Sequence, residues 1–333
     1  MKRWEKKHCS RNYSHPVVSW GKTNSGVSRF HCRICKATFT WQQRDKRFVN
    51  RFSWFEAWLR GSSVSAIAKT SKRNRNTVLK TIYWHLDHPP KPKPIPPNPN
   101  CHLIIDGTWF KRENCLVVYW DTGLKRIQWW RYTTGEIAFE ILADLKSIKE
   151  AGFVLASITS DGGRGIKGAV RVEHPEILHQ RCTIHLQRHT LAWITRNPRT
   201  EAGRQIKPLI QRLSKIKTTR NKDRWLKEIQ DWCLSWESFL KERTYADDGK
   251  HWWYTHKSLR RVRATIINAI PGLFYYLEDK TIPKDSNGLE GRFSSFKQHY
   301  RQHRGLSKKR RKGYIVWYLT VVVNREIPTR WWY

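Results

Sequence analysis

Two aspartates each stand at the end of a short apolar stretch. Asp106 follows Leu103, Ile104 and Ile105, and Asp161 closes the segment 153–160. A carboxylate at the end of a buried strand is held rigidly at the rim of a sheet. Two such strands side by side would therefore offer oxygen ligands to shared divalent ions, Mg²⁺ or Mn²⁺. An ordinary turn remains an alternative, because each aspartate precedes glycine and Asp-Gly is a common turn dipeptide.

A third acidic residue, Glu290, stands before a basic segment. Residues 287–290 match the start of a helix, in which Glu290 could complete a capping box with Asn287. That structural role is the alternative to a metal ligand. The segment that follows is rich in arginine and lysine and would lay a DNA backbone across the site. The candidate DNA contacts in it are Arg292, Lys297, Arg301 and Arg304.

The elements around these acids follow from residue patterns. Segments rich in β-branched and aromatic residues predict strands, and apolar residues on one face predict a helix. The predicted strands are 102–106, 115–120, 126–132 and 153–161, with a helix over 136–150 and mostly helices over about 184–280. This order predicts a mixed α/β sheet with a helical insertion.

Four ordered motifs carry a specific resemblance. They are IIDGTWF (104–110), ITSDGGRGI (158–166), the cluster Gln180, Arg181, Cys182 and His185, and SNGLEG (286–291), the last followed by HRGL (303–306) and WYL (317–319). In this order they resemble the Mutator-like branch of DDE transposases found in bacterial insertion sequences. The resemblance covers about residues 101–320.

The resemblance implies a fold, a reaction and roles for residues. The fold is a ribonuclease-H-like domain over 101–325 with a helical insertion at about 190–280. The implied reaction is two-metal cleavage and strand transfer at terminal inverted repeats, with Asp106 bridging both ions and Asp161 and Glu290 each holding one. Cys182 and His185 are expected to support the active site, since two ligands do not close a zinc site.

The N-terminal residues 1–43 contain a possible metal site. Cys32 and Cys35 form a C-x-x-C knuckle, and Cys9 precedes them. Similar transposases begin with a zinc ribbon of two knuckles, but Asn12 stands where the fourth cysteine is expected. The fourth zinc ligand would then come from a histidine. The candidates are His8, His15 and His31, and a metal-free relic of the ribbon is the alternative.

Residues 46–88 are predicted to be a helix-turn-helix DNA-binding domain, joined by a Pro-rich linker (89–100) to the large domain. Arg73, Arg75 and Asn76 lie where a recognition helix would meet the major groove. The alternative is an ordinary helical hairpin with a basic loop. Farther along, Trp252 and Trp253 precede basic residues and could stack on an unpaired base. Packing in the core of a helical subdomain is the alternative for both.

Composition limits the partners. The chain has 64 Lys+Arg against 27 Asp+Glu, a net charge of +37, which favours a nucleic-acid partner. No apolar run approaches the ~20 residues that span a bilayer, so no membrane association and a cytoplasmic, nucleoid-associated location are expected. Double-stranded DNA is the expected partner, bound by a homodimer on paired ends. A domesticated, non-catalytic DNA-binding regulator and a structure-specific nuclease of the same fold remain alternatives.

Overall fold

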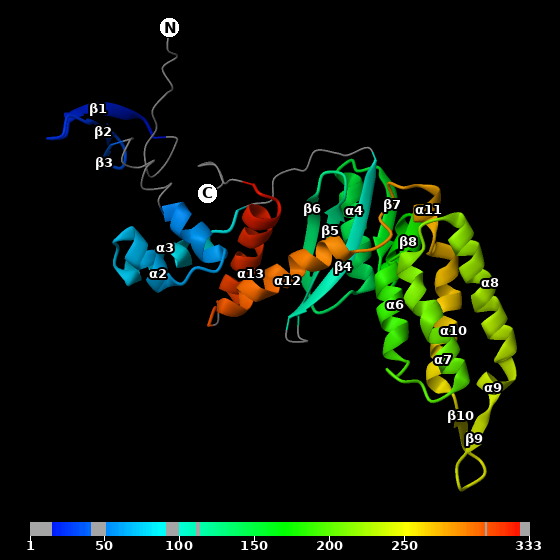
Figure 1. Cartoon of the computed structure of the whole chain (residues 1–333). Helices are drawn as coiled ribbons and strands as arrows, with labels where there is room; N and C mark the ends of the chain where they lie inside the picture. Colours follow the sequence, from blue (N-terminus) through cyan, green and yellow to red (C-terminus); the bar gives the residue numbers. More distant parts are fainter. Residues whose placement is uncertain (1–14, 41–50, 91–99, 111–113, 304, 327–333) are drawn as a thin grey trace. The chain divides into compact units, whose positions relative to one another are not determined.

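The chain contains two compact units (Figure 1). A computed structural model describes residues 15–40, 51–90, 100–110, 114–303 and 305–326. One unit comprises residues 1–90, 301–322 and 327–333, and the other comprises 91–300 and 323–326. Four features predicted from sequence lie outside the described residues, namely His8, Cys9, Arg304 and most of the Pro-rich linker.

The first unit begins with a small antiparallel sheet. Its strands are β1 (Val17–Lys22), β2 (Ser28–Cys32) and β3 (Thr38–Phe39), in the order β1-β2-β3. A tight turn joins β2 to β3, with Lys36 in the left-handed region at φ 57°. This turn contains the C-x-x-C segment, so the small sheet holds the two cysteines in place.

Helices complete the first unit. Residues 51–59 are helical, followed by α2 (Val64–Ser71) and α3 (Arg75–Asp87). Ser63 Oγ caps α2 by accepting the Ala66 N–H at 3.1 Å, and Asn74 Oδ1 caps α3 by accepting the Asn76 N–H at 2.8 Å. The two helices expected within 64–86 are confirmed, with Val78, Ile82 and Leu86 buried on α3.

A late segment packs against these early helices. It consists of α13 (Lys308–Trp317) and the π-helical residues η3 (Tyr318–Val323). Trp317 is fully buried, and its indole N–H donates to the His85 carbonyl at 2.7 Å. A Cβ at Gly313 would lie 2.1 Å from the Leu86 carbonyl oxygen, so α13 and α3 approach backbone to backbone.

The second unit is built on a five-stranded mixed sheet in the order β6-β5-β4-β7-β8. The first three strands of this sheet in chain order, β4, β5 and β6, pair antiparallel, whereas β7 and β8 join in parallel beyond β4. The bounds are β4 (Cys101–Phe110), β5 (Asn114–Asp121), β6 (Arg126–Thr133), β7 (Leu155–Ser160) and β8 (Leu178–Arg181). The predicted mixed α/β sheet is confirmed, and β8 is an additional strand.

Two helices, α4 (Ala138–Glu150) and α5 (Arg164–Glu173), pack on this sheet. Alternation along β4 directs Leu103 and Ile105 into the same core as Leu145 of α4 and Ile166 of α5. The apolar packing anchors β4, which contains Asp106, and β7, which ends immediately before Asp161.

The insertion forms a helical subdomain with its own core, in which Ile206, Trp225, Trp232 and Val262 are buried. A short hairpin lies at its far end from the sheet (Figure 1) and departs from the expected run of helices. In order, the elements are α6 (Thr183–Ala192), α7 (Glu201–Arg212), η1 (Leu213–Lys215), α8 (Thr219–Ser235), α9 (Glu237–Lys241), β9 (Arg243–Tyr245), β10 (Trp252–Tyr254), α10 (Lys257–Ala269), η2 (Ile270–Gly272), α11 (Tyr275–Glu278) and, after the insertion, α12 (Asn287–Gln302). Across the described ranges, no helix is both long and apolar enough to cross a membrane.

Candidate active site

Strand pairing places Asp106 beside Asp161. β4 and β7 run in parallel, and Ile105 pairs with Ser160. Asp106 lies within β4, which continues to Phe110, so the prediction that a strand ends at Asp106 is wrong, whereas Asp161 directly follows the last residue of β7. Continuing the register of Ile105 with Ser160 sets the two aspartates side by side where β7 ends, and neighbouring strands lie about 4.8 Å apart. Asp106 is buried, with 6% of its surface exposed. The two acids that sequence patterns selected therefore meet at one position.

A third carboxylate, Glu136, reaches the same position. It stands in the segment between β6 and α4. A Cβ at Gly163 would lie 3.2 Å from both Glu136 Oε2 and Asp161 Oδ1, and one at Gly107 would lie 2.4 Å from Glu136 Oε1. The two glycines thus leave the space that the carboxylates fill. Sequence reasoning missed Glu136, because an acid just before a helix is common for stabilising the helix N-terminus alone.

Burial and mutual repulsion disfavour the charged forms of the carboxyl groups of Asp106 and Glu136. Burial raises the pKa of Asp106 to about 7, with repulsion from Glu136 and Asp161 adding to the rise and His185 opposing it. Burial also raises the pKa of Glu136 to about 7, again with a contribution from Asp161. Crowded, partly desolvated carboxylates of this kind would be stabilised by a cation among them.

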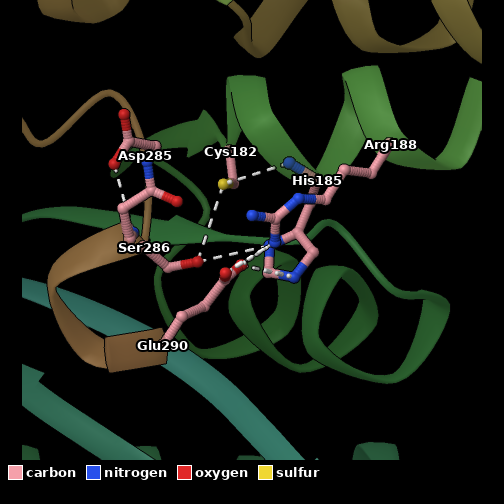
Figure 2. A network of polar contacts seen from close by, with 7 residues as sticks. Cys182, His185, Arg188, Asp285, Ser286 and Glu290 are labelled. Carbon is pink, nitrogen blue, oxygen red and sulfur yellow. Dashed lines mark hydrogen bonds and ion pairs between the residues drawn. The ribbon is translucent and has the colours of Figure 1, made fainter. Parts of the chain in front are cut away.

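Helix α6 contributes a polar network at the other side of the site (Figure 2). Cys182 caps this helix, and its Sγ accepts the His185 N–H at 3.5 Å. Ser286 Oγ lies 3.6 Å from Cys182 Sγ and 3.2 Å from His185 Nδ1. Burial raises the pKa of the Cys182 thiol. Cys182 and His185 therefore fasten α6 to the segment that leads into α12.

Glu290 lies in the first turn of α12 and is held by α6 (Figure 2). Arg188 Nη1 donates to both of its oxygens, at 2.6 and 2.5 Å, and His185 Nε2 lies 3.4 Å from Oε1. The Asn287 N–H, which a capping box would give to Glu290, is donated to Asp285 at 3.1 Å. Glu290 is thus paired with Arg188 and lies close to His185, which also lowers the pKa of Asp106.

Residues 127–249 match the family model described as Transposase, Mutator family. Over this segment the chain is similar to transposases of the Mutator family. The match includes Glu136, Asp161, Cys182 and His185, whereas Asp106 and Glu290 lie on either side of it. No curated protein matches the chain.

The basic residues of α12 in this Mutator-like chain differ in their surroundings. The Arg292 guanidinium carbon lies 4.3 Å from the centre of the Trp120 ring, so this side chain packs on the end of β5. Lys297 is half-buried, and its charge acts on the Cys115 thiol of the same strand. Arg301 is exposed. Arg301 is therefore the most accessible to a large polyanion of these three.

The hairpin of the insertion presents aromatic and basic side chains together. Trp252 and Trp253 are 42% and 41% exposed, so the core-packing alternative is wrong for both. The Arg243 guanidinium carbon lies 3.9 Å from the centre of the Trp252 ring, and Lys257 Nζ lies 5.3 Å from that of Trp253. Exposed rings with adjacent cations are suited to stacking on bases.

The first unit of the Mutator-like chain holds two further candidate sites. The ligand atoms of His15, Cys32 and Cys35 all lie within 4.8 Å of one another, and the Cys35 N–H donates to Cys32 Sγ at 3.3 Å. Of the histidines considered from sequence, His15 joins the cysteines, whereas His31 stacks on Trp20. His8 lies outside the described residues. On α3 and the turn before it, Arg73, Arg75 and Asn76 are exposed.

Proposed function

We propose that the chain is a DDE transposase that cuts DNA at the terminal inverted repeats of an insertion sequence and joins the ends to target DNA. The supporting observation is the parallel pairing of Ile105 with Ser160, which sets Asp106 and Asp161 side by side. A ribonuclease-H-like fold is part of the proposal. The mixed five-stranded sheet and the helical insertion before α12 support it.

Two Mg²⁺ or Mn²⁺ ions are the proposed cofactors, and the donor set fits them. Asp106, Asp161 and Glu136 offer only oxygen, which hard divalent ions prefer. Gly107 and Gly163 leave the space for these carboxylates. When bound, the ions would supply activation of water or a 3′-OH and stabilisation of the leaving oxygen. Glu290 completes the proposed set, which requires its carboxylate to leave the two hydrogen bonds from Arg188 when the metal binds.

The chain's other residues have proposed roles in positioning. His185, hydrogen-bonded to Ser286, orients Glu290 toward Asp106. Arg292, Lys297, Arg301 and Arg304 hold the DNA backbone, while Arg73, Arg75 and Asn76 read the repeats. Trp252 and Trp253 stack on an unpaired base near the cut. Because two ends must be paired, the proposed active form is a homodimer on double-stranded DNA.

Cleavage of labelled repeat ends with added Mn²⁺ tests the proposal. Asp106→Asn and Glu290→Gln should each lower the cleavage rate by at least roughly a hundredfold, because each removes a proposed metal ligand. Binding of the same DNA should stay within about twofold, since neither change removes a cation. Glu150→Gln, which neutralises an exposed acid at the end of α4, is the matched control and should cleave normally.

The alternatives give different results in the same assay. A domesticated regulator would bind repeat ends without cutting them, even as the unaltered protein. A structure-specific nuclease would cut but would fail to join pre-cut 3′-OH ends to target DNA. Retained cleavage by Asp106→Asn would refute the assignment of the metal site.

We also propose that His15, Cys32 and Cys35 bind Zn²⁺, for which nitrogen and sulfur donors are suited. Cys9, the remaining ligand predicted from sequence, would complete the set. Purified full-length protein should contain about one zinc per chain by elemental analysis. Cys35→Ser and His15→Ala should lose it. Cys233→Ser, which alters a half-buried free thiol of the insertion, should keep it.

A further inference from the structure

A basic pocket of about 500 Å³ opens next to Asp161. None of the described residues that line it is acidic. Elements on several sides form the walls, namely β8, α5, α6 and the end of α10 with the η2 turn. The basic and imidazole side chains that line it are Arg164, Lys167, His179, Arg181 and His189. A concave site of this size and charge is suited to a small anionic ligand.

Arg181 lies on the side of this pocket next to Asp161. It ends β8 and pairs with Ser160, the residue before Asp161. Gly162 has φ +71°, and a Cβ there would lie 1.7 Å from Arg181 Nη1, so the guanidinium lies directly against the backbone that follows Asp161. Its Nε is buried without a hydrogen-bond partner, and no ion pair among the described residues includes Arg181. A buried donor without a partner has a strong preference for an acceptor.

The pocket is preformed by close backbone packing. A Cβ at Gly272 would lie 2.7 Å from the His179 carbonyl oxygen, so the η2 turn rests directly on β8. On the inner side, His179 Nε2 and Ser160 Oγ are 2.8 Å apart. Burial, with the nearby charges of Arg181 and Lys167, lowers the pKa of His179 to about 4. These contacts fix the walls before any ligand arrives.

We propose that this pocket binds one nucleotide of the DNA strand beside the cut, with its phosphate on Arg181, Lys167 and Arg164. The proposal rests on the proposed function, because the pocket adjoins the proposed metal ligand Asp161. Guanidinium groups match the geometry of a phosphate, and Arg164 and Arg181 both line the pocket. The base would lie toward Tyr275 and His189, the ring-bearing side chains of the opposite wall.

The pocket's ligand chemistry, a nucleoside phosphate, has two possible sources: a DNA strand and a free nucleotide. Photocrosslinking separates them. Full-length protein is irradiated with a single-stranded oligodeoxythymidylate that carries 5-iodouracil, in EDTA, and the crosslinked peptides are identified by mass spectrometry. The expected crosslink is to the peptide that contains Tyr275 or the one that contains His189. Thymidine monophosphate should compete for this crosslink and thymidine should not, because the phosphate is the recognised group.

Variants test the role of Arg181. Arg181→Met should lower the pocket crosslink roughly tenfold, since it removes charge-assisted hydrogen bonds to the phosphate. Arg171→Met, an equal loss of charge at an exposed position of α5 outside the pocket, should leave it unchanged within about twofold. If Arg181→Met does not fold by thermal melting, Lys167→Met serves in its place with the same expectation.

Three results would overturn the proposal. They are no crosslink to the pocket in the unaltered protein, equal losses in Arg181→Met and Arg171→Met, and competition by thymidine equal to that by its monophosphate. Binding of the mononucleotide without any oligonucleotide crosslink would assign the pocket to a free nucleotide and overturn the DNA assignment. Because EDTA prevents metal-dependent cleavage, these outcomes do not depend on whether Asp106 is catalytic.

Discussion

At the scale of single residues, Gly107 leaves no room for a larger side chain beside Glu136. A Cβ there would lie 2.4 Å from Glu136 Oε1 and 3.0 Å from Cys115 Sγ, so an alanine must displace the carboxylate. We predict that Gly107→Ala lowers the cleavage rate at least roughly tenfold by moving Glu136 away from the two aspartates. Single-turnover cleavage of a repeat end with saturating Mn²⁺ measures the change.

A second glycine provides the control for this prediction. Gly168 lies within α5, and a Cβ there would meet no atom within 4 Å. Gly168→Ala should therefore keep full cleavage and raise the free energy of unfolding by about 0.5–1 kcal/mol, the usual gain for alanine over glycine inside a helix. Equal activity of the two alanine variants would show that Glu136 has no part in the reaction.

The raised pKa values of Asp106 and Glu136 predict a pH-dependent stability. Each is about 7 in the folded chain, against ordinary values of 3.8 and 4.5. Between those values and pH 7 the folded state binds more protons than the unfolded state. The contribution of these groups to stability is therefore largest below their ordinary pKa values and is lost as pH rises toward about 7.

Thermal melting in EDTA tests this dependence. Asp106→Asn has no charge to desolvate, so it should be more stable than the unaltered protein at about pH 8, and the difference should shrink toward about pH 5. Comparing the two proteins cancels the titration of other groups, such as His85, whose pKa is lowered to about 4 chiefly by burial. A difference in melting temperature that is constant with pH would contradict the prediction. Added Mg²⁺ should stabilise only the unaltered protein at the higher pH.

At the scale of elements, α3 has the features of a recognition helix. Its first turn exposes Arg75 and Asn76, while Val78 and Ile82 anchor its other face. We predict that Asn76→Ala or Arg75→Met lowers the affinity for the repeat end roughly tenfold or more while affecting random DNA less, because side chains that contact base edges discriminate by about 1–3 kcal/mol. Fluorescence anisotropy with both DNAs at one salt concentration measures the ratio.

The control for α3 is a change on the same helix. Lys80 is exposed one turn further along, where a cation would contact phosphate alone. Lys80→Met should weaken the binding of both DNAs by a similar factor, and the loss should diminish at higher salt. If Arg75→Met behaves in the same way as Lys80→Met, α3 contributes charge without sequence recognition.

The elements also show what one sequence can predict. The strands that hold Asp106 and Asp161 were predictable, because long β-branched segments have a strong local preference. β8 was not, since its four residues LHQR have no such preference and are extended only through pairing with β7. Glu136 was missed for a related reason. Only the fold brings the segment between β6 and α4 against Gly107 and Gly163.

The role of α13 illustrates the same limit over a longer distance. Its residues 308–312 form a basic run that in sequence looks like a continuation of the DNA-contacting segment. In the fold, Arg310 donates two hydrogen bonds to Asp87, at 3.1 and 2.9 Å, and its guanidinium packs over the Tyr83 ring. Its positive charge is therefore paired with a carboxylate of the same unit. No pattern within residues 308–317 predicts that they pack on α3, because the residues in contact are more than two hundred positions apart in the sequence.

At the scale of the whole molecule, the division into two units predicts that losing a buried side chain in one unit destabilises that unit and leaves the other unchanged. Trp317 is buried against Phe52, Phe55 and His85 in the first unit. Trp232 is buried in the second, where its indole N–H donates to the Ala202 carbonyl at 3.0 Å. Removing either ring leaves a cavity and removes the hydrogen bond that its indole N–H donates, at a cost of roughly 3–5 kcal/mol.

Hydrogen exchange measured peptide by peptide distinguishes the two losses. Trp317→Ala should increase amide exchange across 51–87, although its position is late in the chain, and should leave 201–235 protected as before. Trp232→Ala should do the reverse. DNA affinity should fall with the first variant if the first unit supplies most of the binding, because a loosened α3 no longer presents its first turn. Equal loss of protection in both regions from either variant would mean that the chain opens as one cooperative body.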